Sequence, residues 1–177
     1  SEMFSSSHIL IYDEDVFMGK LLENVLESFG VMRVTTVHTM EEAKILMAKI
    51  NFSAIFMDWR DHQKPSLEFL SYIRLHGEAA NPRIPVIIVT AHTAMQRILY
   101  ARDKGATEVL AKPIAPSHVF DKLYSAIYSE RKFIDLDEYV GPDRRRSRDD
   151  GYHGYDRRKD KSLGQAEIDK VMSDGSS

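Results

Sequence analysis

The stretch Ser53-Ala54-Ile55-Phe56-Met57-Asp58 sets the pattern on which the rest of the chain is built. It is a short apolar run that ends on one carboxylate, and the polar stretch Trp59-Arg60-Asp61 follows it. Such a run, bounded by polar residues, is typical of a strand covered on both faces of a sheet. Ligands of open parallel α/β sheets bind just beyond the carboxyl ends of the strands. Asp58 is therefore a candidate functional residue, and the alternative is that it merely begins a polar loop.

Four other segments have the character of buried strands, and helical spacing of apolar residues follows each strand. The expected strands, with 53–58, are 8–12, 31–37, 84–89 and 107–110. The expected helices are 16–29, 39–50, 66–76, 93–104 and 116–132. Thr39 and Glu42 form a capping-box pattern, and Gly30 and Gly105 end two of the helices. This alternation predicts a doubly wound, five-stranded parallel sheet with helices on both faces.

The composition is that of a globular protein with no covalent cross-links. The 177 residues are 43% hydrophobic and 29% charged, and none is cysteine, which excludes disulfides and thiolate metal sites. No apolar run approaches the roughly 20 residues that a membrane span needs. We therefore expect a cytoplasmic protein without a membrane span.

The polar residues at the strand ends form one group. Asp13 and Glu14 follow the first strand, Asp58 ends the third, Thr90 follows the fourth and Lys112 follows the fifth. Carboxylates that meet at one sheet edge repel each other without a cation, and hard oxygen ligands suit Mg²⁺. The metal and Lys112 could neutralise a phosphoryl group for which Asp58 is the nucleophile. The alternative is a set of unrelated solvated loop residues.

The strings ILIYDED, AIFMDWR, PVIIVTA and GATEVLAKPI resemble the receiver domain of two-component response regulators, from residue 8 to about 130. The resemblance implies a flavodoxin-like (CheY-like) fold with strand order 2-1-3-4-5. It also implies a set of roles: Asp58 as phosphoacceptor, Thr90 as switch hydroxyl, Lys112 as charge partner, and Asp13, Glu14, Asp58 and the Arg60 carbonyl around Mg²⁺.

Two positions depart from the family pattern. The loop 61–66 lacks the usual Pro and Gly placement, and Val109 stands where receivers usually carry an aromatic residue three positions before the lysine. That aromatic residue swings inward when the threonine moves. We therefore expect phosphorylation to alter the outer face of the sheet edge only slightly.

A duplicated basic motif follows the last expected helix. Tyr139-Val140-Gly141-Pro142-Asp143-Arg144-Arg145 recurs thirteen residues later as Tyr152-His153-Gly154-Tyr155-Asp156-Arg157-Arg158. Residues 141–161 carry a net charge of +3 in a chain whose net charge is −3. Gly, Pro and dense charge predict a segment without autonomous structure.

The chemistry of this motif suits a guanine nucleotide. An Arg fork matches the O6/N7 edge of guanine, a carboxylate accepts from its N–H groups, and Tyr or Arg faces stack on a base. Two copies suit cyclic di-GMP, and the segment resembles the arginine-rich tail of CheY-like effectors that bind this ligand and act on the flagellar motor. The candidate ligand-binding residues are Tyr139, Gly141, Pro142, Asp143, Arg144, Arg145, Arg146, Tyr152, Gly154, Tyr155, Asp156, Arg157 and Arg158.

The last part of the chain, 162–172, is predicted to form a short helix capped by Ser162. It resembles the receiver-binding peptide at the start of a flagellar switch protein. It could dock on this receiver, on a neighbour or on the switch protein's partners, and the alternative is an incidental amphipathic tail. The chain thus divides into a receiver domain (1–132), an arginine-rich tail (133–161) and a C-terminal peptide (162–177).

The predicted protein is a single-domain response regulator, not an enzyme, whose tail binds cyclic di-GMP and which signals to a protein partner, the flagellar motor switch. A histidine kinase is a further possible partner. The main alternative is an ordinary receiver phosphorylated on Asp58 with a passive basic tail. Nucleic-acid binding is a third class, and the acids among the arginines disfavour it because a charge of +3 is small for a phosphate-tracking arm. We expect no DNA partner.

Overall fold

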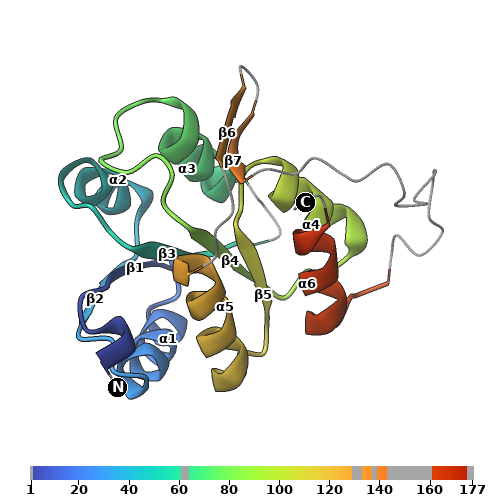
Figure 1. Ribbon diagram of the computed structural model, residues 1–177, viewed down its shortest axis with the longest axis horizontal. Helices are drawn as coiled ribbons and strands as arrows, with labels where there is room; N and C mark the ends of the chain where they lie inside the picture. The colour runs from blue at the N-terminus through green and yellow to red at the C-terminus, as the bar shows by residue number, and fades with distance from the viewer. Residues whose placement is uncertain (1, 61–63, 129–132, 137–138, 143–160, 175–177) are drawn as a thin grey trace.

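A computed structural model describes residues 2–60, 64–128, 133–136, 139–142 and 161–174 of the chain. After a short 3₁₀ helix, η1 (Glu2–Phe4), strands and helices alternate (Figure 1). The strands of the main unit are β1 (His8–Tyr12), β2 (Arg33–Val37), β3 (Ala54–Asp58), β4 (Val86–Thr90) and β5 (Glu108–Ala111). The helices are α1 (Val16–Ser28), α2 (Met40–Lys49), α3 (Lys64–Leu75), α4 (Met95–Asp103) and α5 (Pro116–Tyr128). Residues beyond them form β6 (Phe133–Leu136), β7 (Tyr139–Pro142) and α6 (Gln165–Ser173).

The main sheet is parallel and has the order β2-β1-β3-β4-β5, which confirms the predicted flavodoxin-like topology. Strand β3 lies at the centre and all five of its residues are buried. Its partners are β1, with Met57 opposite Tyr12, and β4, with Asp58 opposite Val89. The carboxyl ends of β1, β3, β4 and β5 therefore lie along one edge.

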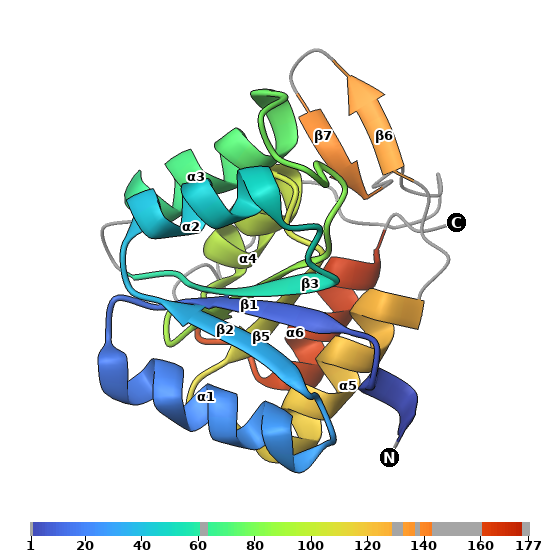
Figure 2. The same ribbon diagram turned by 90° about the vertical axis from the view of Figure 1, so that its left-hand side faces the viewer.

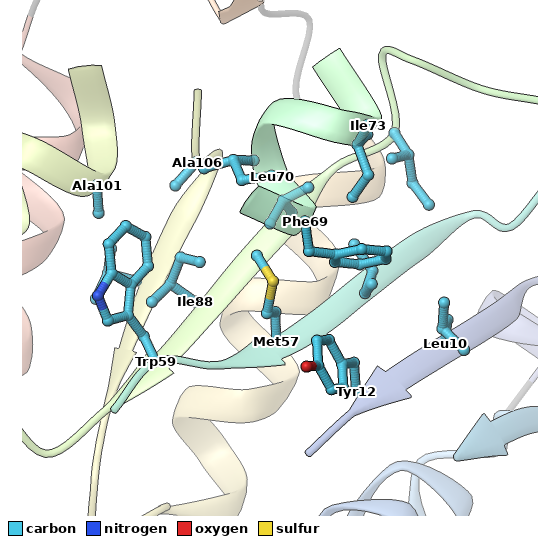
Figure 3. Packing of buried hydrophobic residues seen from close by; sticks show 14 of the residues in the cluster. Leu10, Tyr12, Met57, Trp59, Phe69, Leu70, Ile73, Ile88, Ala101 and Ala106 are labelled. Carbon is cyan, nitrogen blue, oxygen red and sulfur yellow. The ribbon is translucent and has the colours of Figure 1, made fainter. Parts of the chain in front are cut away.

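Helices cover both faces of the sheet, with α1 and α5 on one side and α2, α3 and α4 on the other (Figure 2). Alternate residues of the strands point to opposite faces. Ile55 and Met57 belong to the hydrophobic cluster beneath α2, α3 and α4, and Ala54 and Phe56 belong to the cluster beneath α1 and α5. Figure 3 shows Met57 packed beside Phe69 of α3 in the first cluster.

Several predicted helix boundaries are confirmed by their caps. The Thr39 hydroxyl accepts a hydrogen bond from the Glu42 amide at 3.2 Å at the start of α2. Gly30 and Gly105 have φ angles of 88° and 108°, in the left-handed region that glycine adopts without a Cβ clash. Helix α3 begins at Lys64 and not at Ser66, whose hydroxyl donates to the Asp58 carbonyl at 2.7 Å.

Two parts of the C-terminal region differ from the sequence prediction. The expectation of no autonomous structure is wrong for 139–142, the start of the duplicated motif, which pairs with 133–136 as an antiparallel ribbon, β7 with β6. The prediction that Ser162 caps the last helix is also wrong. Helix α6 begins at Gln165 with Gly164 as its N-cap, because the Glu167 carboxylate accepts from the Gly164 amide at 3.2 Å. Ser162 instead forms an antiparallel bridge with Ala94.

Within the described residues, no helix has both the length and the apolar character needed to cross a membrane.

Candidate functional site

The predicted gathering of polar residues is present at the carboxyl edge of the sheet. Asp58 is the last residue of β3 and Thr90 the last of β4, while Asp13 and Lys112 immediately follow β1 and β5. An open pocket of about 460 Å³ lies at this edge. Its lining residues are Tyr12, Glu14, Asp58, Trp59, Arg60, Pro65, Ser66, Ala91, His92 and Lys112.

Both carboxylate oxygens of Asp58 accept hydrogen bonds from cationic side chains. The Lys112 ammonium donates to Oδ1 at 2.6 Å, and Nε of Arg60 donates to Oδ2 at 2.9 Å. The Asp58 side chain is only 5% exposed, so water has little access to its carboxylate and these two cations are its charged hydrogen-bond partners. The role of Lys112 that the resemblance implied stays a prediction.

Arg60 contacts every carboxylate of the group. Beyond its hydrogen bond to Asp58, its guanidinium lies 3.8 Å from Oδ1 of Asp13 and 3.9 Å from Oε2 of Glu14. The hydrogen bond to Asp58, followed by the charges of these acids, raises the pKa of Arg60. The sequence analysis assigned only the backbone carbonyl of Arg60 and missed the side chain. An arginine two residues after a strand-end acid was the available signal.

Burial raises the pKa of the Asp13 carboxyl, and the charge of Asp58 adds to this shift, whereas a hydrogen bond from the Asp15 amide and the charges of Lys112 and Arg60 oppose it. The Asp15 amide donates to Oδ1 of Asp13 at 2.8 Å. Asp15 is itself the N-cap of α1, because its side chain accepts from the amides of Phe17 and Met18. The start of α1 therefore holds Asp13 in place.

The carboxylates of Asp13 and Asp58 are hard oxygen donors on adjacent strands, and their chemistry fits Mg²⁺. Their geometry in the described residues is not that of an assembled metal centre, since no group of three or more His, Cys, Asp or Glu side chains is arranged to hold an ion. Glu14 has a side chain that is 51% exposed, and the Arg60 guanidinium lies between the acids. Mg²⁺ ligation by Asp13, Glu14, Asp58 and the Arg60 carbonyl stays a prediction.

Thr90 is buried at the end of β4, and its hydroxyl accepts from the His92 amide at 3.0 Å. A second, much smaller cavity lies behind it, beneath α4. Val109 lines this cavity from β5, and Trp59 lines it from the residue after Asp58. Trp59 is 4% exposed and lies close to Ala101 of α4 (Figure 3). An aromatic residue thus lines the same cavity as Thr90, although it directly follows β3 and does not occupy the Val109 position.

The predicted ligand-binding tail is described only at its start. Tyr139, Gly141 and Pro142 belong to β7, which pairs with β6. The remaining predicted tail residues, 143–158, lie outside the described residues.

Comparison with known proteins agrees with this geometry. The family model for the response regulator receiver domain matches residues 9–124. The alginate biosynthesis transcriptional regulatory protein AlgB of Pseudomonas syringae pv. tomato is 29% identical over 115 residues, which are 65% of this chain and 25% of that protein. AlgB of Pseudomonas aeruginosa is 29% identical over 111 residues, 63% of this chain and 24% of that protein. The chain spans about a quarter of the length of these curated relatives.

Solved structures with the same fold include the chemotaxis protein CheY4 of Vibrio cholerae and the receiver domain of the Francisella response regulator 1452. CheY4 has a TM-score of 0.61 and 22% identity, and the match covers 68% of this chain and 98% of that one. The Francisella domain has a TM-score of 0.61 and 20% identity, over 68% of this chain and 96% of that one. At these identities the likeness concerns the fold.

Proposed function

We propose, from the premise that this chain belongs to the response regulator receiver domain family, that it accepts a phosphoryl group on Asp58 and signals to a protein partner. The observation that carries the phosphoryl chemistry is the position of the Asp58 carboxylate, at a strand end and within 2.6 Å of the Lys112 ammonium. A histidine kinase is the expected donor. We expect no catalysis beyond gain and loss of this group.

In the proposed reaction, a carboxylate oxygen of Asp58 attacks the donor's phosphorus and forms an acyl phosphate, while the donor's bond to phosphorus breaks and the donor leaves with those electrons. Lys112 neutralises charge on the transferred group. The Thr90 hydroxyl, at the end of the strand next to β3, would donate a hydrogen bond to the transferred group. Receiver domains typically use Mg²⁺ at this site, and the ion when bound would neutralise phosphoryl oxygens.

A small phosphodonor such as acetyl phosphate, with Mg²⁺, tests this assignment. Mass spectrometry should detect one phosphoryl group on the wild-type protein and none on Asp58→Asn, which keeps the shape of the side chain and removes its charge. Lys104→Ala, an exposed cation on another part of the surface, is the control and should be labelled like the wild type. Equal labelling of Asp58→Asn would contradict the proposal.

We propose further that the tail binds cyclic di-GMP. The support is the repeated Tyr-x-Gly-x-Asp-Arg-Arg unit, which offers a guanidinium fork and a carboxylate to each of two guanines. The main competing function is an ordinary receiver with a passive basic tail. We propose the flagellar motor switch as the partner, because residues 162–172 resemble a receiver-binding segment of a switch protein.

Calorimetric titration with cyclic di-GMP separates these functions. Arg144→Ala and Arg157→Ala should each weaken binding by a similar factor, on the order of 10- to 100-fold at about 1–3 kcal/mol per Arg–guanine contact. Asp143→Ala and Asp156→Ala should also weaken it, whereas a purely electrostatic tail would bind an anion more tightly without them. Tighter binding by the aspartate variants, or equal competition by single-stranded RNA, would contradict a specific nucleotide site.

A further inference from the structure

Strand β5 is an edge strand of the main sheet, and the side chain of Gln165 satisfies its outer backbone groups. Oε1 of Gln165 accepts from the Ala111 amide at 2.8 Å, and Nε2 donates to the Val109 carbonyl at 2.8 Å. A side-chain carboxamide thus makes the pair of hydrogen bonds that a neighbouring strand would make. The unpaired backbone groups of an exposed edge strand can pair with a strand of another chain, and this carboxamide occupies two of those groups.

The residues just before α6 continue this contact along the start of α4. Ser162 bridges Ala94 in antiparallel fashion, and the Leu163 amide donates to the Thr93 carbonyl at 2.9 Å. Figure 1 shows α6, in red, beside β5 and α4. The peptide is therefore held by backbone hydrogen bonds before its helix begins.

The buried face of α6 completes the hydrophobic core. Ile168 and Met172 are fully buried and Val171 is 8% exposed, and all three belong to the same cluster as Ile98 and Val109. Without α6, the five-stranded unit would leave part of this cluster open to solvent. Burial of apolar surface on this scale is the main source of affinity for a docked helix.

Charged groups set the orientation of the helix. Asp169 lies 2.6 Å from the ammonium of Lys122 on α5, and this lysine is buried and also pairs with Glu108 at 3.6 Å. Arg102 of α4, whose side chain is 5% exposed, donates to the Val171 carbonyl at 3.2 Å. Helix α6 thus contacts α4, β5 and α5.

The residues that make these contacts follow one helical stripe. Gln165, Ile168, Asp169 and Met172 lie at positions i, i+3, i+4 and i+7, which share one face of a helix. From this pattern we infer the side chains that the receiver face binds. They are a carboxamide in the first turn, an aliphatic residue one turn later with a carboxylate directly after it, and a thioether two turns later.

We propose that α6 is a tethered, autoinhibitory occupant of the face formed by α4, β5 and α5, and that a partner's helix of the same chemistry must displace α6 to bind there. The statement that a partner's helix displaces α6 rests on the proposed signalling function. The contacts of α6 with the receiver do not depend on that function. A tether gives its ligand an effective concentration in the millimolar range. A free helix of the same sequence therefore binds the intact protein much more weakly than it binds a chain whose own α6 cannot dock.

The test uses the full chain and a fluorescently labelled synthetic peptide of residues 161–174, with anisotropy as the readout. Ile168→Asp in the protein disables the tethered copy and leaves the face itself unchanged. This variant should bind the labelled peptide about 10- to 100-fold more tightly than the wild type does. Ala166→Asp introduces the same charge on the exposed side of α6 and should bind the peptide like the wild type.

A second peptide tests how the edge is recognised. The labelled peptide with Gln165→Glu loses the donor to the Val109 carbonyl and should bind the Ile168→Asp protein at least about 10-fold more weakly. Labelling of Asp58 by a phosphodonor shows in each case that the receiver is folded. If Ile168→Asp is phosphorylated but binds the peptide no more tightly than the wild type, the inference is wrong while the proposed phosphorylation stands. Should Ile168→Asp fail to fold, Gln165→Ala replaces it, and unchanged peptide binding by that variant would overturn the inference.

Discussion

The pocket around Asp58 and the outer edge of β5 are both occupied by groups of the chain itself, but in different ways. In the pocket, two side chains, Lys112 and Arg60, contact a single carboxylate through charge-assisted hydrogen bonds. At the β5 edge, a whole helix contributes a carboxamide, buried apolar residues and an ion pair. The pocket is open and the Arg60 side chain is 51% exposed, whereas Ile168 and Met172 are completely buried.

This difference determines what can replace each occupant. An ion pair that is half exposed is worth about 0–1 kcal/mol, so a divalent cation can take the place of Arg60 at low cost. Each fully buried Ile or Met side chain is worth about 1.5–3 kcal/mol, so α6 is held far more strongly. The pocket can therefore respond to small ions, whereas the β5 edge responds only to another helix or to a change that releases α6.

The largest expected effect concerns the buried face of α6. Met172→Ala removes a fully buried side chain, and such truncations cost about 2–5 kcal/mol, which corresponds to a loss of amide protection in α6 of roughly 30-fold or more. Hydrogen exchange of the α6 amides measures this loss. The change in Trp59 fluorescence on addition of Mg²⁺ should be the same as in the wild type. A different change would show that the pocket and α6 are coupled.

The next effect concerns the pocket. Arg60→Ala removes the cation that lies among Asp13, Glu14 and Asp58, so Mg²⁺ should bind about 5- to 10-fold more tightly, equivalent to about 1 kcal/mol of relieved competition. Titration of Mg²⁺ against the fluorescence of Trp59, the only tryptophan, measures the affinity. Arg83→Ala removes an exposed arginine away from the pocket and should leave the affinity unchanged. Weaker Mg²⁺ binding by Arg60→Ala would mean that the arginine assists the metal and does not compete with it.

A smaller effect is expected at the β5 edge. Gln165→Ala deprives the Ala111 amide of its acceptor, and one hydrogen bond of about 1 kcal/mol corresponds to about 5-fold faster exchange of that amide. Amides of β4, whose ladder partners are unchanged, serve as the internal reference. Uniform acceleration across the sheet would indicate general destabilisation and not a local contact.

The smallest expected effect is the dependence of stability on Asp13. Burial raises the pKa of this carboxyl in the folded state, so the folded protein binds more protons than the unfolded chain between the two pKa values. Its contribution to stability is therefore lost as pH rises through the folded pKa. Asp13→Asn, which cannot ionise, should melt at a slightly higher temperature than the wild type at pH 7, in the absence of Mg²⁺.

That gain should shrink as the pH falls below the unfolded pKa of an aspartate, 3.8, because Asp13 is then neutral in both the folded and the unfolded wild-type protein. Thermal melts followed by circular dichroism at both pH values measure it. A gain that is the same at the two pH values would have a cause other than ionisation.

Sequence patterns predicted the five-stranded parallel sheet and the meeting of Asp13, Asp58 and Lys112, whereas the strand order came from the resemblance to receiver domains. They could do so because alternating buried strands and amphipathic helices permit few arrangements, and parallel strands bring their carboxyl ends to one edge. Only the tertiary structure placed the Arg60 guanidinium among three carboxylates and the Trp59 ring beside Thr90. The position of a long arginine side chain or of a tryptophan ring is set by tertiary packing, which local periodicity does not encode. The sequence likewise left three docking places open for residues 162–172. The receiver's own face was selected because a free strand edge, an incomplete core and a buried lysine meet at β5, α4 and α5 and match the face of α6.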